Sequence, residues 1–156
     1  MRISVCTFGR LRSQPLLKLI ENYQAKFNNS ARMLGLGPLV IKEITIKKKC
    51  SLIFEAQCLI KSIPKGSYKI ALDERGKNLD SLEFANLIAL LRDQGTNDLS
   101  FIIGSADGLH DKIKNDAEYL LSFGKLVWPH LLMRLLLCEQ LYRATSILGS
   151  KPYHRT

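Results

Sequence analysis

Short apolar runs with the length of β-strands alternate with amphipathic, helix-like segments along the whole chain of 156 residues. We predict strands over residues 3–8, 40–46, 68–72, 99–103 and 126–128. Strands that alternate with helices form βαβ units, and such units build a mostly parallel sheet. The pattern therefore predicts an α/β fold in which a mostly parallel sheet is flanked by helices.

Helix signals fill the gaps between these runs. Asp80 is followed three residues later by Glu83, which is the spacing of a capping box, and Gly95 marks the end of that helix. The last helix is predicted over residues 131–148, and its first two turns are apolar nearly all round, which is typical of a buried helix. Further helices are expected after Ser13, after Ser51 and over residues 111–118.

Length and composition fit one globular domain over residues 1–156, with 46% hydrophobic and 24% charged residues. No internal repeat, low-complexity segment or long linker divides the sequence. No window reaches about 18 unbroken apolar residues, so no membrane-spanning helix is expected. The first residues, MRISVCTFGR, lack the long apolar region and cleavage site of a signal peptide and are predicted to form a strand.

The four cysteines, Cys6, Cys50, Cys58 and Cys138, form no CxxC pair. A zinc site would need closer clusters with histidine partners, so no metal is expected. We expect free thiols that are buried or half-buried in a reducing compartment, which indicates a cytoplasmic protein.

The charge balance is strongly basic, with 23 Lys and Arg against 14 Asp and Glu and a formal net charge of +9. Such an excess in one small domain favours a polyanionic partner, first of all nucleic acid, although solubility alone is the alternative explanation. The candidates for a phosphate-facing surface are Arg10, Arg12, Lys47, Lys48, Lys49, Arg75 and Lys77.

Three stretches lie at the ends of predicted strands, where parallel sheets bind their ligands: LDERGK (72–77), IIGSADG (102–108) and VWPH (127–130). None contains the GxGxxG fingerprint or a Walker loop, so a nucleotide-binding oxidoreductase is disfavoured. Apolar walls with backbone donors and acceptors suit a cofactor that is mostly adenine and thioether, whereas plain turns and core packing are the alternative. The residues that would supply such walls are Leu72, Leu126 and Trp128, with loop backbone at Gly104 and Gly124.

The chain ends on Tyr153, His154 and Arg155, which is an aromatic ring, an imidazole and a guanidinium where most domains have a few polar residues. Three stretches together resemble the ribosomal RNA large subunit methyltransferase H family of the SPOUT class. They are IALDERGK, IIGSADG and the terminal VWPHLLMRLLLCEQLYRATSILGSKPYHRT. The resemblance covers essentially the whole chain. Its most specific part is the pattern PH-x-x-x-R-x-x-x-x-E-x-LYRA, from Pro129 to Ala144, followed by the terminal PYHR.

The resemblance implies methyl transfer from S-adenosylmethionine to N3 of a pseudouridine in 23S ribosomal RNA, within a large-subunit stem-loop at the subunit interface. It also implies a sheet whose C-terminal part is threaded into a trefoil knot, a feature too rare to be expected from sequence patterns. The family forms homodimers in which each active site borrows residues from the neighbouring subunit, and its partner is the ribosome, without a membrane or a metal.

The resemblance carries the family's site residues onto matching positions of this chain. The implied cofactor contacts are Leu72, Gly104, Phe123, Gly124, Lys125, Leu126, Val127 and Trp128. The side chain of Lys125 is expected to face outward, because an ammonium group is unfavourable beside a cationic sulfonium.

In the tail, His154 and Arg155 are expected to orient the base or stabilise its anion, in their own subunit or across the dimer, with Tyr142 as a third catalytic candidate. Aromatic rings and guanidinium groups suit a base that has left its stack and the phosphates beside it. The expected RNA-binding residues are Arg143, Tyr153, His154 and Arg155.

The chain departs from the family at one loop, where Gly104-Ser105-Ala106-Asp107-Gly108 replaces a GGPEG-like sequence. This departure keeps an alternative open, namely a non-catalytic ribosome-binding or RNA-binding factor that kept the fold and lost the cofactor.

The sequence leaves the general base undecided between Asp107, His130, His154 and bulk water. The adjacent carboxylates Asp73 and Glu74 are expected to be solvated.

Overall fold

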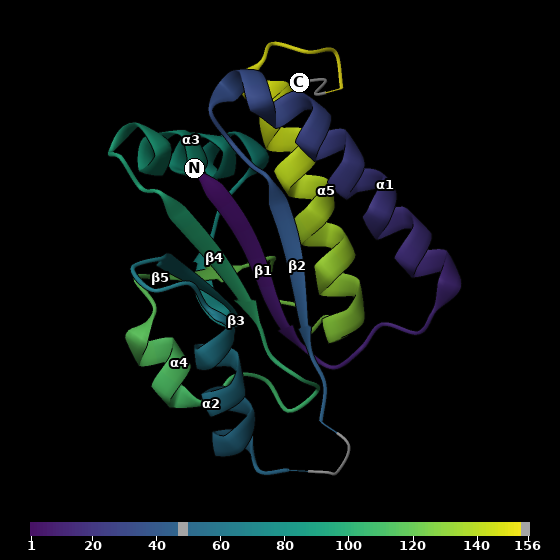
Figure 1. Ribbon diagram of the computed structural model, residues 1–156, viewed down its shortest axis with the longest axis vertical. Helices are drawn as coiled ribbons and strands as arrows, with labels where there is room; N and C mark the ends of the chain where they lie inside the picture. Colours follow the sequence, from purple (N-terminus) through teal and green to yellow (C-terminus); the bar gives the residue numbers. More distant parts are fainter. Residues whose placement is uncertain (47–49, 154–156) are drawn as a thin grey trace.

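The computed structural model describes residues 1–46 and 50–153, and within them five strands form one sheet in the order β2-β1-β4-β3-β5 (Figure 1). All pairings between neighbouring strands are parallel. The strands are β1 (Arg2–Phe8), β2 (Leu39–Ile44), β3 (Tyr68–Asn78), β4 (Asp98–Ile103) and β5 (Tyr119–Ser122). The predicted α/β class with a parallel sheet is confirmed.

Helices cover both faces of this sheet, with α1, α3 and α5 on one face and α2 and α4 on the other (Figure 1). Their bounds are α1 (Gln14–Ala31), α2 (Leu52–Ser62), α3 (Ser81–Asp93), α4 (Asp111–Asp116) and α5 (His130–Leu148), and a short 3₁₀ helix, η1 (Arg32–Leu34), follows α1. In β1, Val5 packs toward the first helical layer and Cys6 toward the second. Because both faces are covered, the central strands are apolar on both sides.

The helix signals of the sequence have the expected local chemistry. The capping box opens α3, where the backbone N–H of Glu83 donates to Asp80 Oδ1 (2.7 Å) and the N–H of Asp80 donates to Glu83 Oε2 (2.9 Å). Ser51 caps α2 by accepting a hydrogen bond from the N–H of Phe54. Gly95 follows the end of α3 with a φ of +82°, a conformation that glycine adopts without strain.

The predicted fifth strand is wrong. Residues 126–128 lie in the loop between β5 and α5, and the side chains of Leu126 and Val127 are 70% and 87% exposed. The fifth strand is instead Tyr119–Ser122, a four-residue edge strand that pairs with β3. A run this short carries little periodicity, so the neighbouring strand rather than the local pattern decides where it forms.

The prediction of a buried last helix holds for one face of α5 only. Leu137, Cys138 and Leu141 are fully buried against the sheet, α1 and α3. Leu132 and Leu136 on the same helix remain partly exposed. The second apolar face of α5 is therefore not covered within the described part of a single chain.

Strand β3 makes an unusual return along β5. Leu121 of β5 is paired both with Leu72 and with Lys77 of β3, so residues 73–76 leave the ladder and come back to it. At Gly76 the two backbones are so close that a Cβ atom would lie 2.7 Å from the carbonyl carbons of Leu120 and Leu121. The passage of β3 along β5 therefore depends on glycine at this position.

We expect Gly76→Ala to lower the free energy of unfolding by about 3 kcal/mol, because the added methyl group meets backbone on β5 that cannot rotate away. Gly66→Ala is the comparison, since a Cβ there meets nothing within 4 Å and only the φ of +74° opposes it. That variant should lose about 1 kcal/mol. Urea unfolding followed by circular dichroism measures the free energy of unfolding of both variants. Equal losses of stability in the two variants would contradict the close approach of β3 to β5 at Gly76.

Candidate functional site

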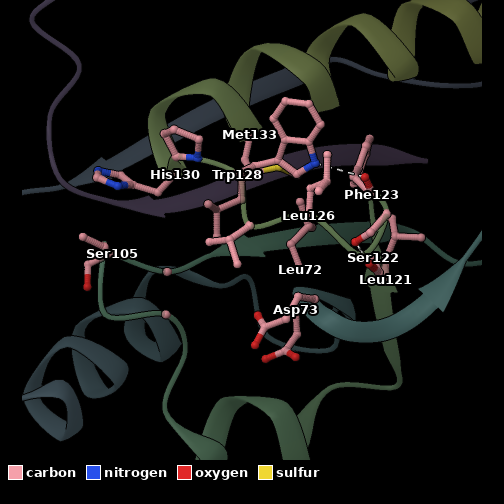
Figure 2. Close-up of a pocket in the computed structure, with 18 of the residues that line it drawn as sticks. Leu72, Asp73, Ser105, Leu121, Ser122, Phe123, Leu126, Trp128, His130 and Met133 are labelled. Carbon is pink, nitrogen blue, oxygen red and sulfur yellow. Dashed lines mark hydrogen bonds between the residues drawn. The ribbon is translucent and has the colours of Figure 1, made fainter.

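A cavity of about 580 Å³ lies at the carboxyl ends of β3, β4 and β5, beside the first turn of α5 (Figure 2). Its walls come from residues 72–74, 103–108, 121–124 and 126–130, together with Met133. The three stretches that the sequence singled out thus meet at one place. The volume is in the range of small-molecule sites, which are about 300–1,000 Å³.

Seven of the eight expected cofactor contacts line this cavity: Leu72, Gly104, Phe123, Gly124, Leu126, Val127 and Trp128. Lys125 is exposed and is not among the lining residues, so its side chain faces away from the cavity as expected. Figure 2 shows the indole of Trp128 beside Met133 on one side of the cavity and Asp73 on the opposite side.

Three hydrogen bonds shape the loop between β5 and α5. The indole Nε1 of Trp128 donates to the carbonyl of Phe123 (3.1 Å), and Ser122 Oγ donates to the carbonyl of Gly124 (2.8 Å). The N–H of Gly124 donates to Asn78 Oδ1 (2.9 Å), which ties the loop to the end of β3. The loop therefore keeps a defined shape although Leu126 and Val127 are exposed.

The loop after β4 is a tight turn that requires glycine at its base. A Cβ on Gly104 would collide with the backbone of Gly108. The N–H of Gly108 donates to the carbonyl of Ser105 (3.1 Å), and the N–H of Asp107 donates to Ser105 Oγ (3.3 Å). Ser105 thus stabilises the turn that replaces the family's usual loop, and Asp107 is left exposed at the cavity rim.

The expectation that Asp73 is solvated is wrong. Its side chain is only 8% exposed, and its Oδ2 lies 3.5 Å from the ammonium of Lys114 on α4. Its Oδ1 accepts a hydrogen bond from the N–H of Arg75 (2.9 Å), which stabilises the turn that leaves β3. Glu74, by contrast, is exposed. Asp73 therefore fastens the middle of β3 to α4 while it lines the cavity.

His130 begins α5 and lines the cavity from the side opposite Asp73 (Figure 2). Burial lowers the pKa of this imidazole, and the nearby guanidinium of Arg134 lowers it further, whereas Glu55 raises it. His130 is therefore neutral at pH 7. The charged side chains among the described residues that line the cavity are the carboxylates Asp73, Glu74 and Asp107.

Arg134, the arginine of the PH-x-x-x-R pattern, is 1% exposed and joins three parts of the fold. Its Nη1 contacts Glu43 Oε1 of β2 at 2.9 Å, and its Nη2 donates to the carbonyls of Phe8 (2.7 Å) and Gly9 (2.9 Å) after β1. Burial lowers the pKa of Arg134, and the Glu43 carboxylate opposes that effect. The first turn of α5, which carries His130, is therefore clamped to the ends of β1 and β2.

Tyr142 and Arg143 lie in the C-terminal half of α5, and neither they nor Tyr153 line the cavity. Tyr142 is twelve residues beyond His130, which is about 18 Å along a helix axis. The rings of Tyr142 and Tyr153 are 4.7 Å apart, and the guanidinium of Arg143 lies 5.0 Å from the Tyr153 ring. The fold gathers these three expected residues in one cluster but does not bring them to the cavity of their own chain. His154 and Arg155 lie outside the described residues.

Residues that the sequence reasoning missed include Leu121, Ser122 and Met133, which all line the cavity. The first two were missed because the fifth strand was predicted too late in the chain. The apolar run from Tyr119 to Phe123, which ends at a glycine, was the available signal. Met133 lies one helical turn after His130, so a face-by-face reading of α5 would have found it.

Three further features concern metal ligands, membrane-spanning helices and thiols. Across residues 1–46 and 50–153, no group of three or more His, Cys, Asp or Glu side chains is arranged to hold a metal ion. In the same residues, no helix is both long and apolar enough to cross a membrane. All four cysteines are free thiols, with Cys6 and Cys138 buried and Cys50 and Cys58 partly buried.

The lowered pKa of His130 predicts a pH dependence of stability. The unfolded chain takes up the proton near the ordinary value of 6.5, before the folded chain does, so stability falls as the pH drops below about 6.5. In His130→Gln this component should disappear, which gives a smaller loss of Tm between about pH 7.5 and pH 5. Thermal melts of both proteins across that range measure the effect, and identical pH profiles would contradict a shifted His130.

Arg134→Met should lower the free energy of unfolding by about 3–5 kcal/mol, because it leaves Glu43 and two carbonyl groups without their partner. Arg75→Met is the matched control, since Arg75 is 81% exposed and its contact with Glu74 is at the surface. That control should change stability by less than about 1 kcal/mol. Urea unfolding of both variants measures these free energies. A loss of stability in Arg134→Met as small as that of the control would contradict the role of Arg134 in holding α5 to β1 and β2.

Comparison with known proteins gives a consistent result. A family model described as "Predicted SPOUT methyltransferase" matches residues 1–154. The chain is 47% identical to a protein of Dinoroseobacter shibae and 46% identical to proteins of Ruegeria pomeroyi and Roseobacter denitrificans, each over 155 residues that cover 99% of both chains. All three are named ribosomal RNA large subunit methyltransferase H. This chain therefore belongs to the SPOUT methyltransferase family, in the group of ribosomal RNA large subunit methyltransferase H.

Proposed function

We propose that this methyltransferase transfers a methyl group from S-adenosylmethionine to N3 of a pseudouridine in the 23S RNA of the large ribosomal subunit. The relatives' name gives large-subunit ribosomal RNA as their target. The observation that carries the proposal is the cavity itself, in which three stretches remote in sequence line one space at the carboxyl edge of the sheet.

The cavity walls fit S-adenosylmethionine. Leu72, Leu126 and Trp128 supply apolar surface for an adenine ring and a thioether, and the backbone of the loops at Gly104 and Gly124 supplies donors and acceptors. The charged groups among its described lining residues are carboxylates, which favour a cationic sulfonium, and the neutral His130 adds no repulsion. Residues 72, 104 and 123–128 would hold the cofactor, with Lys125 contributing backbone only.

When bound, the cofactor supplies an electrophilic methyl group. The protein must then hold the target base, exclude water and accept the proton of N3. His130 in its neutral form and Asp107 at the cavity rim are the described candidates for proton acceptor, alongside His154 and bulk water. The apolar side chains of the loop between β5 and α5 would help to exclude water.

Basic side chains surround the same edge of the sheet and support an RNA substrate. Arg10 and Arg12 are exposed in the loop that follows β1, and Arg75 and Lys77 are exposed on the β3 segment that returns along β5. They would contact phosphates outside the cavity, whose own wall is acidic. Residues 47–49, the remaining candidates, lie outside the described residues.

We propose a homodimer in which the tail of one subunit completes the cavity of the other. The distance of about 18 Å between His130 and Tyr142 along α5 supports this, because one chain cannot bring both to one target base. The partly exposed Leu132 and Leu136 of α5 and the exposed Leu126 and Val127 at the cavity mouth are apolar surfaces that a second copy would cover. The tail and the helix before it would then act on RNA bound at the partner's cavity, through Tyr142, Arg143, Tyr153 and residues 154–155.

We also propose that residues 1–156 form one domain with a C-terminal trefoil knot, as the SPOUT family implies. The return of β3 along β5, which is the strand directly before the loop and α5, supports such threading. A ribosomal substrate supports a cytoplasmic location.

The alternative is a non-catalytic ribosome-binding factor that has lost the cofactor. The Ser105-Ala106-Asp107 departure motivates it, but Ser105 stabilises its turn through two hydrogen bonds and leaves the cavity open. Cofactor binding distinguishes the two functions.

We expect the full chain to transfer labelled methyl groups from S-adenosylmethionine to ribosomes that lack the modification, with the label on a pseudouridine of 23S RNA. Deleting residues 154–156 should abolish transfer and leave cofactor binding within about twofold, because Tyr153, the residue directly before them, does not line the cavity of its own chain. Mass spectrometry of the RNA and calorimetry with S-adenosylmethionine measure the two properties. Ribosome binding without cofactor binding would favour the non-catalytic factor.

Dimers that combine two different inactive chains test whether the tail of one subunit acts at the cavity of the other. A chain without residues 154–156 and a chain carrying Gly104→Val, which blocks the turn at the cavity, should each be inactive. A heterodimer of the two keeps one intact cavity facing one intact tail, and it should recover up to about half of the wild-type activity. No recovery would exclude a tail that acts across the dimer.

A further inference from the structure

Glu139 of the E-x-LYRA pattern lies at the middle of α5 and accepts hydrogen bonds from three side chains. Its Oε1 accepts hydrogen bonds from Arg143 Nε (3.0 Å) and Nη2 (2.6 Å) and from the hydroxyl of Tyr153 (3.1 Å). Its Oε2 accepts from Gln140 Nε2 (2.7 Å). One carboxylate therefore holds both Arg143 and Tyr153, two of the expected RNA-binding residues.

Tyr153 is held by further contacts on the same cluster. Its ring packs against Tyr142 at 4.7 Å and under the Arg143 guanidinium at 5.0 Å. Its hydroxyl lies 3.5 Å from the hydroxyl of Tyr23 on α1. Tyr153 is therefore fixed against two helices, directly before residues 154–156.

The cluster is also tied to the body of the fold. Ser81, the first residue of α3, donates from its Oγ to Gln140 Oε1 (2.8 Å), and Gln140 in turn donates to Glu139. The Glu139 and Arg143 side chains are only 17% and 27% exposed, so their charge-assisted bonds are partly shielded from water. The carboxylate is thus held in place from the side of α3 as well.

The bonds from Arg143 to Glu139 use Nε and Nη2. A guanidinium has five N–H donors, and no bond among residues 1–46 and 50–153 uses Nη1, which can therefore donate to a phosphate or a base edge. The ion pair therefore orients Arg143 without using all of its donors. Side chains that are ordered before binding lose less entropy when the RNA arrives, which strengthens binding.

We propose that Glu139 is the positioning residue of the tail, which fixes Arg143 and Tyr153 so that the tail presents one arrangement to the RNA. This inference rests on the proposed function. Glu139 acts through its neighbours and does not touch the reacting atoms.

The test compares Glu139→Gln with wild type and with Glu21→Gln, a control that removes one carboxylate from the exposed side of α1. Methyl transfer from S-adenosylmethionine to unmodified ribosomes should fall at least about tenfold in kcat/KM for Glu139→Gln. It should stay at the wild-type value for Glu21→Gln. Binding of S-adenosylmethionine should stay within about twofold in both, because neither Glu139 nor Glu21 lines the cavity. Glu139→Asp, which keeps the charge, should recover part of the activity.

Tyrosine ionisation gives a readout that does not depend on activity. Burial, the Tyr23 hydroxyl and the Glu139 charge together raise the pKa of Tyr153, while the cations Arg143 of α5 and Lys26 of α1 also face this cluster. In Glu139→Gln one tyrosine should therefore ionise at lower pH than in wild type. Tyr153→Phe identifies that tyrosine in an ultraviolet titration.

The outcomes separate the two proposals. A wild-type chain that transfers no methyl group overturns the proposed function and this inference with it. An active wild type with an equally active Glu139→Gln overturns the positioning role alone. A parallel loss of Tm, cofactor binding and activity would mean that Glu139 serves only the fold, and this also overturns the inference.

Discussion

The close passage of β3 along β5 is the constraint on which the site depends. Because Leu121 pairs with both Leu72 and Lys77, the segment between them must leave the ladder and turn at the carboxyl edge of the sheet. That turn contributes Asp73 to the cavity, and the N–H of Gly124 then bonds to Asn78 at the end of the same strand. A side chain at Gly76 would separate the two strands, and the loop that carries Trp128 would lose its support.

Helix α5 connects two ends that need different chemistry. At its first turns, the buried pair of Arg134 and Glu43 holds the helix to β1 and β2 and keeps His130 in the cavity wall. From the middle of the helix, Glu139 holds Arg143 and Tyr153 in the half that lies farther from the cavity. The rigid helix keeps these ends apart, which is the physical reason for proposing that two subunits share one reaction site.

The charges are arranged in the way that the proposed cationic cofactor and RNA substrate require. Carboxylates and a neutral imidazole line the described wall of the cavity, while exposed arginines and a lysine lie outside it, on the loop after β1 and on the returning part of β3. An RNA phosphate would be attracted to the rim but not into the cavity, whereas a sulfonium would be favoured inside. The net charge of +9 therefore describes the outer surface rather than the site.

Local patterns in the sequence determined the α/β class, the central strands and the start of α3, because alternating apolar runs and a capping box depend on residues close together in the chain. The motif resemblance led to seven of the residues that line the cavity.

The fifth strand depended on tertiary structure, since Tyr119–Ser122 becomes a strand only beside β3. The apolar residues 126–128 line the cavity instead of joining the sheet. The partners of Arg134 and Tyr153 were also beyond sequence reasoning, because Glu43 and Tyr23 lie 91 and 130 residues away in the chain. Only the packed structure could decide those contacts, since burial and charge pairing act between residues that the fold, not the chain order, brings together.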